Sequence, residues 1–184
     1  MKKISEQNSF ADKKILVAYF SRTGEEYGVG NITKGNTAIV AEVIAAVTGG
    51  DLFEIKPATP YPDNYNACIE LSKSEIKSNA RPEFVGNVDN LAQYDTIFIG
   101  YPIWYSLLPR VVLTFLESGD FSGKTIIPFC THGGSGLAGS EREIKKACPN
   151  SKILAGTAIY GKTAQSNSDA LKRDVEAWLK VSGY

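Results

Sequence analysis

Three segments of this chain carry groups that can bind a ligand, and each follows a run of apolar residues. The first begins at Ser21 and ends with Lys-Gly-Asn-Thr at 34–37, the second is Tyr-Pro-Ile-Trp-Tyr-Ser at 101–106, and the third is Thr-His-Gly-Gly-Ser-Gly at 131–136. Their residue types predict anion binding, aromatic stacking and backbone hydrogen bonding, respectively.

The first segment has the composition of a phosphate site. Hydroxyl groups and glycines where a helix begins supply free backbone N–H groups and a favourable dipole for a phosphate. The segment lacks GxGxxG, GxxxxGK[ST] and an acidic residue placed for a ribose, so a terminal phosphate is favoured over a pyrophosphate. The alternative is plain helix capping by Asn36 or Thr37.

The second segment combines a strand stop with two aromatic side chains. Pro102 restricts Tyr101 to extended geometry and helps to end the strand. Trp104 or Tyr105 can stack on a flat ring, an interaction of roughly 0.5–1.5 kcal/mol beyond burial. The alternative is that both rings pack on the helix that follows.

The third segment places glycine at 133, 134 and 136 directly after an apolar strand. Such a backbone can approach a ligand closely and offer amide groups to its carbonyl oxygens. His132 can donate a hydrogen bond or a proton near neutral pH, which makes it the candidate catalytic residue. The alternative is a flexible turn with a surface histidine.

The elements that must position these segments alternate along the chain. Apolar runs predict strands over 14–20, 51–55, 96–100, 124–130 and 153–159, and amphipathic patterns predict helices over 36–47, 64–78, 109–116, 140–147 and 167–181. This alternation predicts an α/β fold, a doubly wound parallel sheet with helices on both faces. Such sheets bind ligands beyond the carboxyl ends of their strands. The three segments together therefore predict a site for a flat heterocycle with a phosphate on a flexible tail, flavin mononucleotide (FMN).

Length and charge narrow the remaining possibilities. The 184 residues suit one domain over 14–184, preceded by a polar arm over 1–13. Twenty basic residues balance twenty acidic ones, which argues against nucleic acid or an anionic membrane as partner.

Cys68, Cys130 and Cys148 show no CxxC spacing, which indicates reduced thiols in a cytoplasm. With one histidine and no ligand cluster, no metal site is expected.

Four motifs, taken in order, resemble the flavodoxin-like superfamily, most closely its bacterial branch with PIW and THGGSG loops. They are VAYFS at 17–21, GNT at 35–37, IGYPIW at 99–104 and CTHGGSG at 130–136, and the resemblance extends over nearly the whole chain from residue 14. It implies a five-stranded sheet of order 2-1-3-4-5 and non-covalent FMN. By position, it implies that the phosphate is held by Ser21, Gly35, Asn36, Thr37 and Ala38. The isoalloxazine would be flanked by Pro102, Ile103, Trp104 and Tyr105. Its pyrimidine side would meet Thr131, His132, Gly133, Gly134, Ser135 and Gly136.

The sequence departs from the family pattern in three places. An insertion over 23–34 interrupts the phosphate loop, so that Arg22 and Thr23 become weak candidates for phosphate ligands and 25–27 either covers the site or is disordered. The 102–105 turn lacks the glycine that electron-transfer flavodoxins often use there, and the chain is neutral where classical flavodoxins are acidic.

These departures favour two-electron reduction of a small acceptor such as a quinone by NAD(P)H. A single-electron carrier serving a protein partner and a flavin-free interaction module are the alternatives. Quinone-reducing relatives commonly pair across the flavin edge, so a homodimer is compatible with the sequence.

Overall fold

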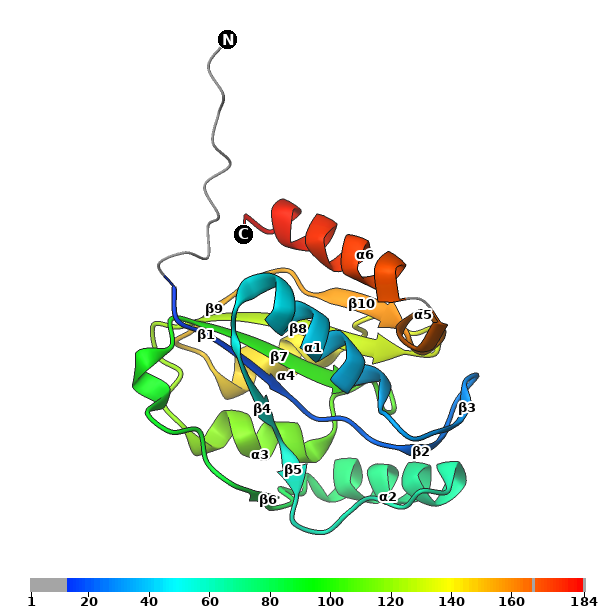
Figure 1. Ribbon diagram of the computed structural model, residues 1–184. Coiled ribbons are helices and arrows are strands. Elements are labelled where there is room, and N and C mark those ends of the chain that lie inside the picture. The colour runs from blue at the N-terminus through cyan, green and yellow to red at the C-terminus, as the bar shows by residue number, and fades with distance from the viewer. Residues whose placement is uncertain (1–12, 167, 184) are drawn as a thin grey trace.

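A parallel β-sheet forms the centre of the computed structural model, which describes residues 13–166 and 168–183 (Figure 1). Nearly all of the predicted N-terminal arm lies outside the described residues. The sheet consists of β1 (Ile15–Tyr19), β4 (Asp51–Glu54), β7 (Thr96–Pro102), β8 (Thr125–His132), β9 (Lys152–Ile153) and β10 (Thr157–Tyr160). Its order is β4-β1-β7-β8-β10, with β9 also paired to β8. This order, with every pair parallel, confirms the predicted arrangement 2-1-3-4-5.

Helices cover both faces of the sheet because successive strand residues point to opposite sides. Ile97 and Ile99 of β7 are buried in one apolar cluster, and Phe98 between them is buried in the other. The second cluster takes its helical residues from α1 (Asn36–Thr48), α5 (Gly161–Ser166) and α6 (Ser168–Val181). The first takes them from α2 (Tyr65–Ser78), α3 (Arg110–Ser118) and α4 (Ser140–Ala147). Burial on both faces explains why the central strands are apolar without interruption.

Strands β7 and β8 each run two residues beyond the predicted ends, and this changes the shape of the site. Pro102 is the last residue of β7 and is in register with Thr131. Strand β1 ends at Tyr19, opposite Gly100, so β7 has no partner on that side at residue 102 and a proline without an N–H is tolerated. Thr131 and His132 therefore belong to a strand and have fixed directions.

The prediction of one continuous last strand over 153–159 was wrong. Residues 154–156 separate β9 from β10, so the edge of the sheet is interrupted. Several short elements were not predicted at all. They are the antiparallel hairpin of β2 (Gly24–Glu26) and β3 (Gly30–Ile32), the pair β5 (Lys56–Pro57) and β6 (Phe84–Val85), the 3-10 turn η1 (Leu91–Gln93), and α5.

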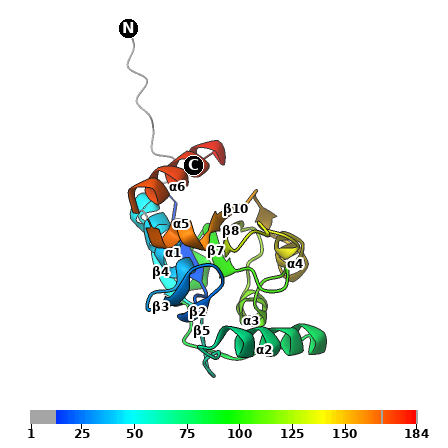
Figure 2. The same cartoon turned by 90° about the vertical axis from the view of Figure 1, so that its right-hand side faces the viewer.

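The β2–β3 hairpin lies at the carboxyl end of the sheet, on the same side of the molecule as α2 and α5 (Figure 2). It is formed by the inserted residues, so the insertion is an ordered element and the alternative of disorder was wrong. Across residues 13–166 and 168–183, none of the helices has the length and apolar character needed to traverse a bilayer.

Candidate functional site

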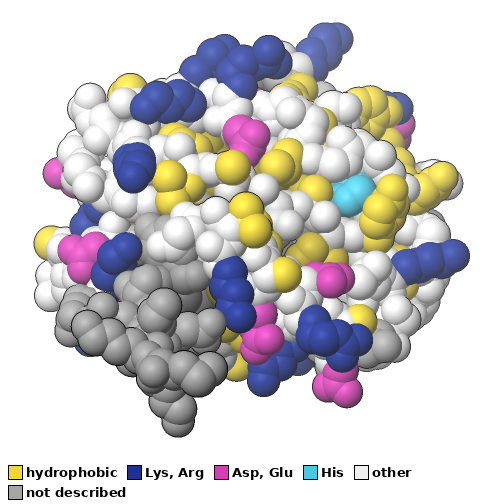
Figure 3. All heavy atoms as spheres, turned by 90° about the horizontal axis from the view of Figure 1, so that it is seen from above, with side chains coloured by type: hydrophobic (Ala, Val, Ile, Leu, Met, Phe, Trp, Pro, Cys, Tyr) yellow, Lys and Arg dark blue, Asp and Glu magenta, His cyan; other side chains and the backbone are white. Residues whose placement is uncertain are grey.

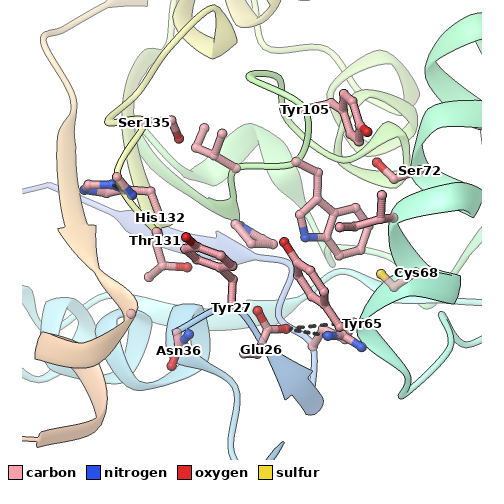
Figure 4. Close-up of a pocket in the computed structure, with 18 residues that line it drawn as sticks. Glu26, Tyr27, Asn36, Tyr65, Cys68, Ser72, Tyr105, Thr131, His132 and Ser135 are labelled. Atoms are coloured by element: carbon pink, nitrogen blue, oxygen red, sulfur yellow. Dashed lines mark hydrogen bonds and ion pairs between the residues drawn. The ribbon is translucent and has the colours of Figure 1, made fainter. Parts of the chain in front are cut away.

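A cavity of about 420 Å³ opens where β7 and β8 end, within the size range of small-ligand and cofactor sites. Figure 4 shows the side chains that line it. Most of the predicted cofactor-binding residues are among them: Asn36, Pro102, Ile103, Trp104, Tyr105, Thr131, His132, Gly133, Gly134 and Ser135. The cavity lining does not include Ser21, Gly35, Thr37, Ala38 or Gly136. The three predicted segments thus meet at one place in the fold.

The start of α1 presents backbone donors at one end of this cavity. Among the described residues, no protein group accepts a hydrogen bond from the amide N–H of Asn36 or Thr37, while the N–H of Ala38 donates to Ser21 Oγ at 3.0 Å. The first turn carries no acidic residue. Unpaired N–H groups at a helix N-terminus attract an anion, so this helix start can hold a phosphate.

Gly35 allows the chain to fold tightly around this helix start. Its backbone is extended, with φ −66° and ψ 146°, so a side chain would be excluded by space and not by φ. A Cβ at this position would overlap Ser21 Oγ and the carbonyl oxygen of Arg22. Gly35 and Ser21 therefore support the start of α1 from the side away from the cavity and do not line the cavity.

Thr37 also lies outside the cavity lining. Its side chain is buried, and its hydroxyl lies 2.8 Å from that of Thr131 at the end of β8. This hydrogen bond joins the end of the first segment to the third segment. The Thr37 side chain thus links the start of α1 to the end of β8, and only its backbone N–H is left without a partner among the described residues.

The second segment forms a tight two-residue turn. Trp104 and Leu107 exchange backbone hydrogen bonds of 2.9 and 3.0 Å. Tyr105 and Ser106 between them have φ of 52° and 61°. Both central residues of such a turn need positive φ, which costs a non-glycine residue roughly 1–2 kcal/mol. Tyr105 and Ser106 thus adopt a left-handed backbone conformation that usually requires glycine. Backbone strain of this kind is concentrated at functional sites.

The two aromatic side chains of this turn have different surroundings. Trp104 packs edge-to-face on Phe20 and Tyr61, with ring centroids 5.4 and 4.8 Å apart, and it also lines the cavity. Tyr105 is 51% exposed, and Lys73 Nζ lies 5.1 Å from its ring centroid. Trp104 therefore has the fixed position that a stacking ring needs, whereas one face of Tyr105 is taken by α2.

The third segment is ordered by its own histidine. Nδ1 of His132 accepts the N–H groups of Gly134 at 2.9 Å and of Gly136 at 3.2 Å. We call residues 133–136 the amide loop. The sequence predicted that these amides face a ligand, but two of them face the His132 ring instead.

The surroundings of the His132 ring favour its neutral form. Burial lowers its pKa, and this effect outweighs the opposing hydrogen bond to the Ala158 backbone. The ring also lies against Tyr160, with centroids 4.3 Å apart. Because Nδ1 accepts two backbone N–H groups, the geometry supports a role for His132 in positioning the amide loop, and its role in proton transfer stays a prediction.

Two further walls of the cavity lie outside the predicted cofactor-binding residues, although residues 25–27 were expected either to cover the site or to be disordered. Helix α2 contributes Tyr65, Cys68, Ile69 and Ser72, and the hairpin region contributes Arg22, Glu26 and Tyr27. Glycines at 24, 28 and 30, all with positive φ, were the available signal for a hairpin. Burial raises the pKa of the Cys68 thiol to about 11, so this group is a neutral part of the wall.

Arg22 and Glu26 form an ion pair at 3.0 Å in this region. Burial raises the pKa of Glu26, and the adjacent Arg22 guanidinium opposes that shift. Arg22 also donates to the carbonyl oxygens of Pro62 at 2.6 Å and Asp63 at 3.1 Å. Its guanidinium is therefore used within the protein, in agreement with its weak candidacy as a phosphate ligand.

Comparison with known proteins agrees with this arrangement. A family model described as flavodoxin matches residues 14–179. A Bacteroides eggerthii protein provisionally described as a flavoprotein is 36% identical, with a TM-score of 0.75 over 94% of this chain and 99% of that chain. A similar protein from Bacteroides uniformis is 34% identical, with a TM-score of 0.71 over 89% and 98%.

A flavoprotein from Lactobacillus acidophilus, solved in complex with FMN, shares the fold at 20% identity. Its TM-score is 0.64 over 82% of this chain and 95% of that chain. The search of curated proteins gave no match.

Proposed function

The chain belongs to the flavodoxin family, and we propose that it binds FMN non-covalently and passes electrons from NAD(P)H to a small acceptor such as a quinone. The observation that carries this proposal is the cavity itself. Its lining includes Asn36 at the start of α1, whose N–H has no partner among the described residues, together with Trp104 and the glycine-rich loop. FMN has the matching parts, a phosphate on a flexible chain and a flat ring system.

The residues present fit this cofactor. The N–H groups of Asn36 and Thr37 would hold the phosphate, and Trp104 with Ile103 would flank the rings. The amide loop, kept in place by His132, would offer its remaining N–H groups to the polar edge. The complex of the Lactobacillus acidophilus flavoprotein with FMN supports the same cofactor.

FMN supplies the redox chemistry when bound, and the chain sets its environment. The three free thiols are buried, which supports the proposed cytoplasmic location. Basic and acidic side chains both occur on the face seen in Figure 3, in keeping with a net charge of zero. A net charge of zero supports a small acceptor over a strongly charged protein partner.

Titration of the apo-protein with FMN, followed by flavin fluorescence, tests the proposal. We expect saturable quenching at one FMN per chain. Trp104→Ala should weaken binding, since a stacked ring contributes roughly 0.5–1.5 kcal/mol beyond burial, about a twofold to tenfold change in Kd. A chain that leaves FMN fluorescence unchanged would instead support the flavin-free interaction module.

A single-electron carrier is the second candidate, and it shares the fold and the cofactor. Stepwise anaerobic photoreduction separates the two. We expect the bound flavin to pass to its fully reduced form without a strongly populated one-electron stage. Strong accumulation of that stage would favour the carrier.

A further inference from the structure

We propose that Tyr27, on the β2–β3 hairpin, contacts the bound flavin and determines how tightly it is held. The hairpin is formed by inserted residues and is therefore an added part of the site. This inference rests on the proposed FMN function. It concerns a residue in the inserted part of the first segment, which the sequence analysis expected either to cover the site or to be disordered.

The base of the hairpin is fixed to the N-terminus of α2. The N–H of Glu25 donates to the carbonyl oxygen of Asp63 at 2.8 Å, and the Glu25 carboxylate accepts from Asn64 Nδ2 at 2.8 Å and from the N–H of Tyr65 at 2.9 Å. At Gly24, with φ of +92°, a Cβ would lie 2.7 Å from the carbonyl oxygen of Asp63. Glycine alone permits this approach, so the position of the hairpin is built into the sequence.

A buried arginine holds the strand that leads to Tyr27. Arg22 is 8% exposed, and its donors reach Pro62, Asp63, the Glu25 carbonyl oxygen and the Glu26 carboxylate. A buried guanidinium is stable only when its donors are satisfied in this way. Strand β2 is thereby fixed to residues 62–65, and the residue after it has a defined place.

The Tyr27 ring lies in the cavity between two supports. Its centroid is 6.2 Å from that of Tyr65, and a Cβ on Gly133 would lie 2.6 Å from its Cδ1 atom. Figure 4 shows both tyrosines in the cavity with their hydroxyl groups on the same side. Tyr27 nevertheless remains 66% exposed. A supported ring with free surface in a cofactor-sized cavity is suited to packing against a flat ligand.

Replacement of the ring tests the proposal through FMN affinity, without a turnover assay. We expect Tyr27→Ala to raise the Kd for FMN about threefold to tenfold in a fluorescence titration. Tyr27→Phe, which keeps the ring, and Val85→Ala, a matched change at an exposed apolar residue of β6, should stay within about twofold of wild type. Circular dichroism and the urea midpoint would show that each variant folds. An unchanged Kd in Tyr27→Ala would overturn the hairpin inference alone, whereas a wild-type chain that fails to bind FMN would overturn the proposed function as well.

A second variant tests whether the contact between Tyr27 and the amide loop positions the ring. The backbone of Gly133 is outside the positive-φ region, so alanine is compatible with its conformation, but the added Cβ would displace the Tyr27 ring. We expect Gly133→Ala to weaken FMN binding more in the wild-type background than in Tyr27→Ala. Equal effects in the two backgrounds would show that the ring acts independently of Gly133 and would overturn this part of the proposal.

Discussion

Protonation of His132 should release the amide loop, and this effect can be isolated by substitution. The neutral ring accepts two backbone N–H groups at Nδ1, at 2.9 and 3.2 Å. A proton on Nδ1 removes both bonds. At about 0.5–1.5 kcal/mol for each bond, the loss is about 1–3 kcal/mol.

The sign of the pH dependence follows from the direction of the shift. The pKa of His132 is lowered from 6.5 in the folded chain, mainly by burial. The unfolded chain therefore binds this proton more readily. The stabilising contribution is present above pH 6.5 and is lost as the pH falls through the folded-state pKa.

Urea unfolding of the apo-protein between about pH 8 and 5 measures the effect, with His132→Asn as the matched control. The Asn Oδ1 atom can take the place of Nδ1 as an acceptor and does not titrate near neutral pH. Other shifted groups, such as Glu26 and Glu75, occur in both proteins and cancel in the difference. We expect wild type to lose about 1–3 kcal/mol more than the variant on acidification. A difference that stays constant over this range would refute the assigned role of His132.

Three further substitutions test the packing at the start of α1 and the buried ion pair between α3 and α4. Gly35→Ala should lower the free energy of unfolding by about 1–3 kcal/mol, because its Cβ would overlap Ser21 Oγ; an unchanged urea midpoint would contradict this. Glu143→Ala should cost about 3–5 kcal/mol, because it leaves the buried Arg110 guanidinium without the carboxylate at 2.7 Å. A loss of unfolding free energy below about 1 kcal/mol would show that the Arg110–Glu143 pair contributes no more than an exposed ion pair and would contradict this prediction. Thr37→Val keeps nearly the same side-chain shape but removes the buried hydroxyl bond to Thr131 of β8, so it should lower the free energy of unfolding by about 1 kcal/mol. An unchanged unfolding temperature in calorimetry would show that this bond does not stabilise the fold.

The sheet and the location of the site were predictable because both depend on local patterns. Apolar runs of strand length, separated by amphipathic helices, require a parallel sheet covered on both faces. Parallel strands bring their carboxyl ends to one edge, so the segments after them had to meet. Most of the residues predicted there, such as Asn36, Trp104 and Gly133, do line the cavity.

The direction of each group within these segments was not predictable in the same way. Ser21, Thr37 and Gly136 have the residue types of a binding site, yet their side chains or amides are used by Ala38, Thr131 and His132. Residue type shows that a group can form a hydrogen bond, whereas its partner depends on which segments the fold brings within reach.

The sequence by itself determined the family, the order of the strands and the edge of the sheet at which the candidate site lies. Tertiary structure decided which elements close the cavity. The hairpin and α2 meet through Arg22 and the carbonyl oxygens of Pro62 and Asp63, about forty residues further along the chain. Tyr27 reaches Gly133 from more than one hundred residues away. Periodicity reports only neighbours within one strand or helix, so contacts of this range arise only when the whole chain is folded.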